Sequence, residues 1–358
     1  GLTVTVTEVS TGDADTISGV ETLRFDDGDI AISQDANGLL LTGSAGSDTI
    51  TIVGDVPVTV LGGDGADVIT GAEGDDLIDG GLGDDYLSGG DGVDVITGAE
   101  GSDTIDGGSG DDVAVFAGDQ SEYTFASSAD GLTVTVTEVS TGDADTLTGV
   151  ETLRFVDGDI TVSADANRLV LTGSSGVDTI TVVGDVPVTV LGAESADVIE
   201  GGLGGDVLSG EAGDDIIEGG LGDDIIEGGA GSDTVVLSGN KGDFTFAVAT
   251  DGTLTVTDVS TGNSLGVDTI SGVETLSFND GDLTVTTTDD GYVTLTGSGA
   301  DDVITIGDGL SSGLTAEYYT GTGGNGNFSA GTLYTTRTDA TINFEQMWDG
   351  ALPSNSSS

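Results

Sequence analysis

Thr and Val alternate along several stretches of the chain, which predicts β-strands with one buried and one exposed face. The alternation is clearest in Leu132–Thr137 and returns in shorter form at Val188–Val190. Clusters of Gly, Asp and Asn separate these runs, as turns require. No segment has a convincing helical periodicity, and only three prolines interrupt the chain. The pattern predicts an all-β protein.

A second pattern places one aliphatic residue in each unit of nine. Six nonapeptides run without a gap over 62–115, and five more over 192–236. Position one is Gly and position six is Asp in all eleven, while position four is Gly in ten and position eight is Ile, Leu or Val in ten. The consensus G-G-x-G-x-D-x-U-x, with U a large aliphatic residue, predicts a tight turn followed by a short strand. Two units make a coil of about 18 residues, so residue i stacks on residue i+18 in a parallel β-roll or β-solenoid.

A larger repeat encloses these arrays. The segment Gly1–Phe25 returns at Gly131–Phe155 and, more loosely, at Gly252–Phe278, and the second spacing is nine residues shorter than the first. The first copy begins within a module, so we expect a piece of a larger protein. We predict six segments: a strand-rich flank (1–42), a first array (43–115, strict nonapeptides 62–115), a strand-rich segment between the arrays (116–172), a second array (173–236, strict nonapeptides 192–236), a strand-rich segment ending in a partial repeat (237–312), and a truncated start of another domain (313–358).

The charge narrows the possible partners. The chain has 65 acidic and 5 basic residues, a formal net charge of −60, and this self-repulsion opposes compaction unless cations bind or screen it. It argues against binding to nucleic acid or to anionic membranes, and no apolar run is long enough for a membrane helix. Cys and His are absent, which excludes the usual zinc sites, Ser-His-Asp triads and disulfides. Oxygen ligands remain, and they suit hard cations such as Ca2+.

The arrays therefore predict several Ca2+ sites between stacked turns. The glycines allow a turn whose carbonyl groups point to one side, and the position-six aspartate can present its carboxylate to the same point. Carboxylates about 4.8 Å apart in neighbouring coils repel each other, whereas Ca2+ takes about six to eight such oxygens. About four ions are expected in the first array and about three in the second. The predicted carboxylate ligands are Asp67, Asp76, Asp85, Asp94, Asp103, Asp112, Asp197, Asp206, Asp215, Asp224 and Asp233, and the predicted carbonyl ligands are Gly65, Gly74, Gly83, Gly92, Gly101, Gly204, Gly213 and Gly222.

Isolated units outside the strict arrays contain Asp48, Asp178 and Asp302, for which a ligand role and a turn-forming role stay equally open. One aliphatic residue per unit makes a thin core that cannot by itself offset the ordering of the backbone. Metal binding must then supply much of the folding free energy, and we expect disordered arrays without Ca2+. A salt-adapted surface is an additional explanation for the acidity. Neighbouring carboxylates such as Asp75 and Asp76 belong to the repeating turn, so no catalytic residue and no enzymatic activity are predicted.

The eleven in-phase nonapeptides resemble the RTX (repeats-in-toxin) family. That resemblance implies parallel β-rolls, export by bacterial type I secretion, and folding outside the cell, where Ca2+ is plentiful. The C-terminal segment resembles the opening of a PA14 domain, a β-sandwich often linked to carbohydrate binding. The residues that carry this second resemblance are Gly313–Tyr319, Arg337–Asp339, Ile342–Phe344 and Trp348. The sugar-binding part of that family lies beyond the residues present.

These features lead us to expect a calcium-dependent structural or adhesive region of a large secreted or cell-surface protein, in which stiffened modules act as a spacer. Its expected partners are calcium ions and a cell-surface or matrix polysaccharide. Two alternatives stay open. One is a self-assembling surface layer or extracellular filament in which copies of the module pack together. The other is the secretion and folding region of an RTX exoenzyme whose catalytic domain lies elsewhere.

Overall fold

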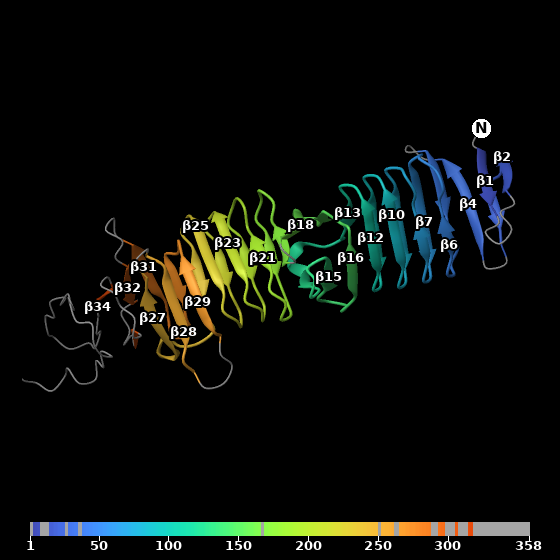
Figure 1. Cartoon of the computed structure of the whole chain (residues 1–358). Helices are drawn as coiled ribbons and strands as arrows, with labels where there is room; N and C mark the ends of the chain where they lie inside the picture. Colours follow the sequence, from blue (N-terminus) through green and yellow to red (C-terminus); the bar gives the residue numbers. More distant parts are fainter. Residues whose placement is uncertain are drawn as a thin grey trace, which may run out of the picture.

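The computed structural model describes residues 3–7, 14–25, 28–34, 38–165, 168–249, 252–260, 265–287, 293–297, 305–306 and 314–317. Asp302 and almost all of the PA14-like segment lie outside these residues. The described chain is all-β and elongated, with strands stacked side by side along its length (Figure 1). Within the described residues, no helix has the length and apolar character needed to cross a membrane. The predicted all-β fold with parallel β-roll arrays is confirmed.

One sheet runs along the whole stack, and we call it the long sheet. Its strands in the order of their pairing are β3 (Thr22–Arg24), β4 (Asp29–Gln34), β5 (Leu39–Thr42), β7 (Val58–Asp64), β9 (Leu77–Leu82), β11 (Val95–Glu100), β13 (Val113–Val115), β17 (Thr152–Arg154), β18 (Asp159–Asp165), β19 (Arg168–Thr172), β21 (Thr189–Leu191), β23 (Val207–Ala212), β25 (Ile225–Ala230), β29 (Val267–Ser271), β28 (Leu254–Asp258), β27 (Phe244–Val248) and β33 (Thr305–Ile306).

Two shorter sheets form the opposite face. The first contains β6 (Thr49–Thr51), β8 (Val68–Thr70), β10 (Tyr86–Asp91), β12 (Thr104–Ser109), β16 (Ala144–Thr148), β15 (Thr133–Glu138) and β14 (Tyr123–Ser127). The second contains β20 (Thr179–Thr181), β22 (Val198–Glu200), β24 (Ile216–Glu218), β26 (Thr234–Val236), β30 (Thr275–Ser277), β31 (Leu283–Thr287), β32 (Val293–Gly297) and β34 (Leu314–Glu317). The hairpin of β1 (Thr3–Thr7) and β2 (Ala14–Ser18) and the short 3-10 helices η1 (Gln120–Glu122) and η2 (Lys241–Asp243) complete the described elements.

The register within the arrays follows the predicted coil of 18 residues. In the long sheet Leu77 pairs in parallel with Val95, and in the first short sheet Val68 pairs with Tyr86. Successive nonapeptides therefore alternate between the two faces, and each residue lies over its equivalent two units earlier. The predicted stacking of residue i on residue i+18 is confirmed.

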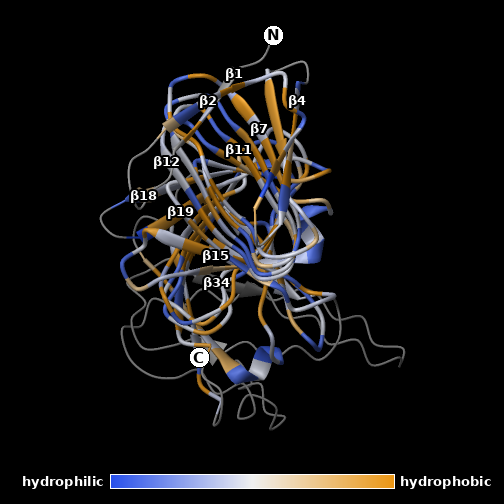
Figure 2. Ribbon diagram, turned by 90° about the vertical axis from the view of Figure 1, so that its right-hand side faces the viewer, coloured by the Kyte–Doolittle hydropathy of each residue, from blue (hydrophilic) through white to orange (hydrophobic). Residues whose placement is uncertain are grey.

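The core lies between the two faces and is one aliphatic side chain thick in each unit. Every position-eight residue of the eleven nonapeptides is at most 1% exposed. Position seven and position nine point outward because side chains alternate along a strand. In the view from the end where β1 lies, strands such as β4 and β7 carry hydrophobic residues, drawn in orange (Figure 2). This thin interior leaves little apolar burial per residue to hold the coil closed.

The flanking segments continue the stack. In the first short sheet β16 pairs in parallel with β12. In the long sheet β17 pairs with β13, β18 joins β17 to β19, and β19 pairs with β21, so this sheet passes from the first array into the second. Aromatic rings thicken the core at this junction, where Phe155 contacts Phe116, Tyr123 and Phe125 at ring-centroid distances of 5.1–5.9 Å. On the surface, Arg154 pairs with Asp159 at 3.4 Å. The segment after each array therefore adds a wider, aromatic core, because Phe278 contacts Phe244 and Phe246 in the same way after the second array.

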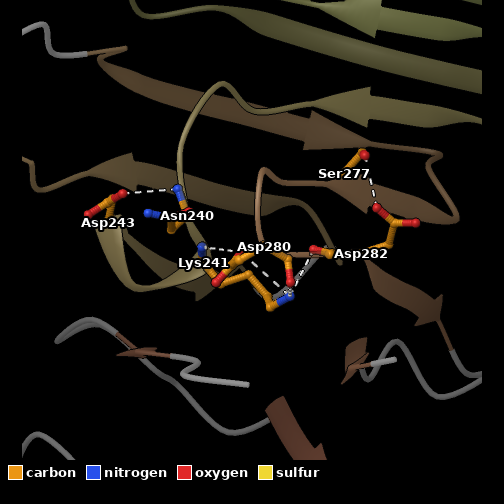
Figure 3. A network of polar contacts seen from close by, with 7 residues as sticks. Asn240, Lys241, Asp243, Ser277, Asp280 and Asp282 are labelled. Atoms are coloured by element: carbon orange, nitrogen blue, oxygen red, sulfur yellow. Dashed lines mark hydrogen bonds and ion pairs between the residues drawn. The ribbon is translucent and has the colours of Figure 1, made fainter. Parts of the chain in front are cut away.

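Equivalent buried residues, Gln120 and Lys241, begin the flank after each array. Gln120 is fully buried and donates from Nε2 to Asp178 Oδ1 at 2.7 Å. Lys241 is 1% exposed and donates from Nζ to the carbonyl oxygens of Asp280 and Gly281 at 3.0 and 2.8 Å (Figure 3). Its ammonium group also lies 3.6 Å from Asp280 Oδ1. The buried cation is thus held by backbone oxygens and a carboxylate, as a buried charge requires.

Candidate metal centre

Most turns of the arrays have left-handed backbone at positions two and four. Gly81 and Gly83 have φ values of +103° and +128°. A β-carbon on Gly83 would overlap the carbonyl oxygen of Gly65 in the preceding coil. Ala99 and Ser195, which replace glycine at these positions, also have positive φ values, +76° and +84°. Glycine adopts this conformation without steric cost.

The position-six aspartates form buried ladders along the stack. In each ladder the backbone N–H of one aspartate donates to Oδ1 of the aspartate 18 residues later, as Asp67 does to Asp85 and Asp85 does to Asp103 at 2.7 and 2.8 Å. The same bond joins Asp76 to Asp94 and Asp94 to Asp112. In the second array it joins Asp197 to Asp215, Asp215 to Asp233, and Asp206 to Asp224. All eleven aspartates are at most 3% exposed. The predicted stacking of the carboxylates is therefore confirmed.

The second carboxylate oxygen has no protein partner in ten of the eleven aspartates. Oδ2 is buried and accepts no hydrogen bond in Asp67, Asp85, Asp94, Asp103, Asp112, Asp197, Asp206, Asp215, Asp224 and Asp233. The exception is Asp76, whose Oδ2 accepts from the N–H of Ala72 at 3.1 Å. A buried, unpaired polar oxygen is costly, and ten in one repeating position indicate a ligand at that position.

Carbonyl oxygens of the turns lie close to the position-six carboxylates. A β-carbon on Gly62 would overlap both Asp67 Oδ2 and the Gly80 carbonyl oxygen of the next coil. A β-carbon on Gly213 would overlap the Ser195 carbonyl oxygen and lie 2.9 Å from Asp215 Oδ1. Oδ2 of each array aspartate therefore lies near the position-one glycine of its own unit, and in Asp112, Asp206 and Asp215 Oδ1 lies near the position-four glycine.

Most of the predicted carbonyl ligands lie against a glycine of the next coil. The carbonyl oxygens of Gly65, Gly74, Gly83, Gly92, Gly204, Gly213 and Gly222 each lie against the glycine one coil further along. Gly101 instead borders a cavity beside the strand-rich segment that follows the first array. Among the described residues, no group of three or more acidic side chains is arranged to hold a metal ion. A cation between coils would therefore need carboxylate and carbonyl oxygens together, the donor set that Ca2+ prefers.

Burial and mutual repulsion raise the pKa of the ladder carboxyls. The pKa of Asp85 is raised to about 6, chiefly by desolvation and further by the charges of Asp103 and Asp67. Desolvation likewise raises the pKa of Asp94 and Asp206 to about 6 and that of Asp197 to about 7. The ionised form of these groups is disfavoured without a cation, so a bound divalent ion would remove the main electrostatic cost of the fold.

The isolated aspartates Asp48 and Asp178 begin the ladders and differ from the array aspartates. Their backbone N–H groups donate to Asp67 and Asp197, but Oδ2 of each accepts from the N–H and hydroxyl of a nearby serine, Ser44 or Ser174. Oδ1 of Asp178 also accepts from Gln120. These satisfied oxygens favour the turn-forming role for both residues.

A second, outer ladder explains the adjacent aspartates. Asp84 is exposed, and its Oδ1 accepts from the N–H of Ser102 at 2.9 Å, while Asp85 points inward. Asp75 accepts in the same way from Val93, and Asp214 from Ser232. Neighbours in the sequence therefore face opposite sides of the turn.

Four carboxylates that the repeat did not predict extend the inner ladders into the flanks. Asp103 donates from its N–H to Asp145, Asp112 donates to Glu151, Asp224 donates to Asp268, and Asp233 donates to Glu274, at 2.8–3.1 Å. A signal existed: the segment Asp145-Thr-Leu-Thr-Gly149 keeps the aspartate, strand and following glycine of a nonapeptide without the preceding turn. The missing turn glycines concealed the relation.

The position-six carboxylates are expected to matter more for calcium than their outer neighbours. Asp85→Asn keeps the Oδ1 acceptor for the Asp67 N–H but removes the charge shared by two coil interfaces. We expect it to weaken Ca2+ binding by roughly tenfold or more, the effect of losing about 1.4 kcal/mol, as measured by isothermal titration calorimetry. Asp84→Asn is the matched control, and an equal loss in both variants would contradict the assignment.

Comparison with known proteins identifies the nonapeptide repeat in part of the chain. Residues 59–87, 79–114 and 200–235 match the family model described as "RTX calcium-binding nonapeptide repeat (4 copies)". Among solved structures, the extracellular lipase LipA from Serratia marcescens matches with 22% identity and a TM-score of 0.22, over 62% of this chain and 38% of the lipase chain. The chain thus spans less than two thirds of the lipase. Among curated proteins, none matches the chain. The two arrays consist of RTX calcium-binding nonapeptide repeats, and Ca2+ is the metal that this match supports.

Proposed function

We propose that the chain is a calcium-dependent structural region of a large secreted or cell-surface protein, and that Ca2+ binding drives its folding and stiffening outside the cell. The observation that carries this proposal is the repeated, buried and unpartnered Oδ2 in ten position-six aspartates. A bound Ca2+ ion would supply the positive charge that lets these carboxylates remain ionised within the stack.

The other features of the repeat are consistent with calcium-coupled folding. Turn glycines let neighbouring coils approach, the position-six carboxylates and turn carbonyls face one another across each coil interface, and the position-eight side chains fill a thin core. Without a cation, the crowded buried carboxylates oppose closure of the coil more strongly than this core can offset. Folding is therefore coupled to the calcium concentration, which is high outside cells and low in the cytosol.

A stiff spacer is the mechanical role that suits the continuous long sheet. Its seventeen strands, at about 4.8 Å each, span roughly 80 Å. We infer that such a rod projects an adhesive domain away from a surface and has no catalytic activity of its own. Binding to polysaccharide rests on the PA14-like segment and stays a prediction. Export by type I secretion is what the RTX repeats support.

The test is a Ca2+ titration of the purified chain, followed by circular dichroism and light scattering and reversed with chelator. We expect strand signal to appear with Ca2+ and to be lost with chelator, while light scattering stays that of a monomer. Equal strand signal in chelator would overturn the folding mechanism. Growth of sheets or fibres with Ca2+ would replace the spacer role with self-assembly.

A further inference from the structure

The ladders of buried carboxylates do not end where the nonapeptides end. We call the two flank residues that receive the last N–H bonds of each array its flank rungs; they are Asp145 and Glu151 after the first array, and Asp268 and Glu274 after the second. These bonds repeat the aspartate-to-aspartate geometry inside the arrays. Their sequence separations of 39–44 residues, instead of 18, show that a whole strand meander is inserted before the rung.

The last aspartates of each array still have one carboxylate oxygen without a hydrogen-bond partner. Oδ2 of Asp103 and Oδ2 of Asp112 are buried and unpartnered, and these two residues are 1% and 0% exposed. Asp224 and Asp233 repeat the observation in the second array. An unpaired oxygen at the final interface needs a ligand there as much as one inside the array does.

The flank also supplies a backbone oxygen at the same place. A β-carbon on Gly107 would lie 2.8 Å from Asp112 Oδ2 and would overlap the carbonyl oxygen of Gly149, which belongs to the flank. Gly228 stands in the same relation to Asp233 and to the carbonyl oxygen of Gly272. Gly149 and Gly272 have φ values of +59° and +62°, so the flank turns take up left-handed backbone as the nonapeptide turns do.

A cavity connects one of these rungs with solvent. It has a volume of about 230 Å3, and its lining includes Glu100, Glu138, Asp143 and Asp145. This space is large enough for several water molecules. Three further carboxylates around it raise the local cation concentration beside Asp145. A hydrated cation therefore has both a route to the rung and an attractive field along it.

We propose that the flank rungs complete additional Ca2+ sites with the last aspartates of each array, so that the flanking meander docks onto the roll only when calcium is bound. This inference rests on the proposed calcium-dependent folding of the arrays. It extends metal binding to residues that have no nonapeptide turn. It also gives the flank a role as a calcium-dependent cap, which closes the open end of the thin core with its aromatic cluster.

The test compares three double variants of the full chain. In Asp145→Asn with Glu151→Gln, both amide side chains keep an oxygen that can accept the array N–H bonds, but the charges are lost. The matched control is Asp15→Asn with Glu21→Gln, which changes the same sequence motif in the first module, where the described β2 pairs only with β1. In the third variant, Asp145→Glu with Glu151→Asp, the carboxylates are exchanged and the charges stay.

The readouts are bound calcium per chain, measured by elemental analysis after gel filtration, and hydrogen exchange of β14–β16. We expect the amide variant to lose about two ions, one for each rung, and to lose calcium-dependent protection of β14–β16. The control is expected to lose neither, and the exchanged variant to retain both ions. An amide variant with the ion count of the control would overturn the cap while leaving the arrays' function intact. A wild-type chain that binds no calcium would overturn the proposed function itself.

Discussion

Replacing Gly83 by alanine is expected to disrupt the first array even in saturating calcium. Gly83 has φ of +128°, and a β-carbon there would overlap the Gly65 carbonyl oxygen and lie 2.6 Å from its carbon. Left-handed backbone alone costs an L-residue about 1–2 kcal/mol, and relief of the overlap must separate two coils whose carboxylates and carbonyls face each other. We expect the melting temperature with Ca2+ to fall by roughly 10 °C or more, as a loss of several kcal/mol implies.

The chain contains a control for this substitution. A β-carbon on Gly242, in η2, would meet nothing within 4 Å beyond its neighbours in the chain, so Gly242→Ala should leave the melting temperature and calcium binding nearly unchanged. The native residues Ala99 and Ser195 do not contradict the expectation, because their φ values of +76° and +84° are closer to the left-handed region open to L-residues. If Gly83→Ala has the same melting temperature as the wild type in calcium, the two coils do not approach as closely as described.

Acidification is expected to stabilise the calcium-free chain and to weaken the effect of calcium. The pKa values of Asp85 and Asp224 are raised to about 6 in the fold, and those of Asp197 and Asp268 to about 7, chiefly by desolvation, from an ordinary value of 3.8. Between about pH 4 and pH 7 the folded chain therefore holds more protons than the unfolded chain, and the free energy of unfolding rises as the pH falls. Protons and calcium compete for the same carboxylates, so the gain from calcium must shrink over the same range.

The measurement is the difference in melting temperature between samples with calcium and samples with chelator, from about pH 8 to about pH 5. We expect a large difference at the alkaline end that falls steeply through about pH 6 and is small at the acidic end. High concentrations of monovalent salt serve as the control, because screening alone would reduce the difference at every pH alike. A difference that stays constant with pH would show that the buried aspartates are not the groups to which calcium binds.

The expectations for calcium and for pH share one electrostatic origin. Stacking at about 4.8 Å brings like charges together in every coil, and burial removes the water that would otherwise separate them. The eleven position-six aspartates meet this problem repeatedly because each belongs to the same short unit. A cation between coils relieves this repulsion once per coil. The stabilisation of the chain by calcium should therefore scale with the number of nonapeptides.

The repeat alone determined the main architecture of this protein. Position-eight side chains recur every nine residues, so their burial and the stacking of Asp67 on Asp85 follow from spacing, and both are present in the structure. The same spacing predicted which carboxylates face each interface. Local periodicity is sufficient for these features because each coil repeats the contacts of the one before it.

Only the tertiary structure decided which residues continue the carboxylate ladders where the nine-residue repeat stops. Asp145 lies 42 residues from Asp103 in the sequence, because the strands β14 and β15 are inserted between them, and no periodic rule places it on the ladder. The structure likewise separated Asp178, whose oxygens are satisfied by Gln120 and Ser174, from the array aspartates whose Oδ2 has no partner. Long-range pairing and the satisfaction of single oxygens depend on which distant groups the fold brings together, and that information is not contained in the spacing of a repeat.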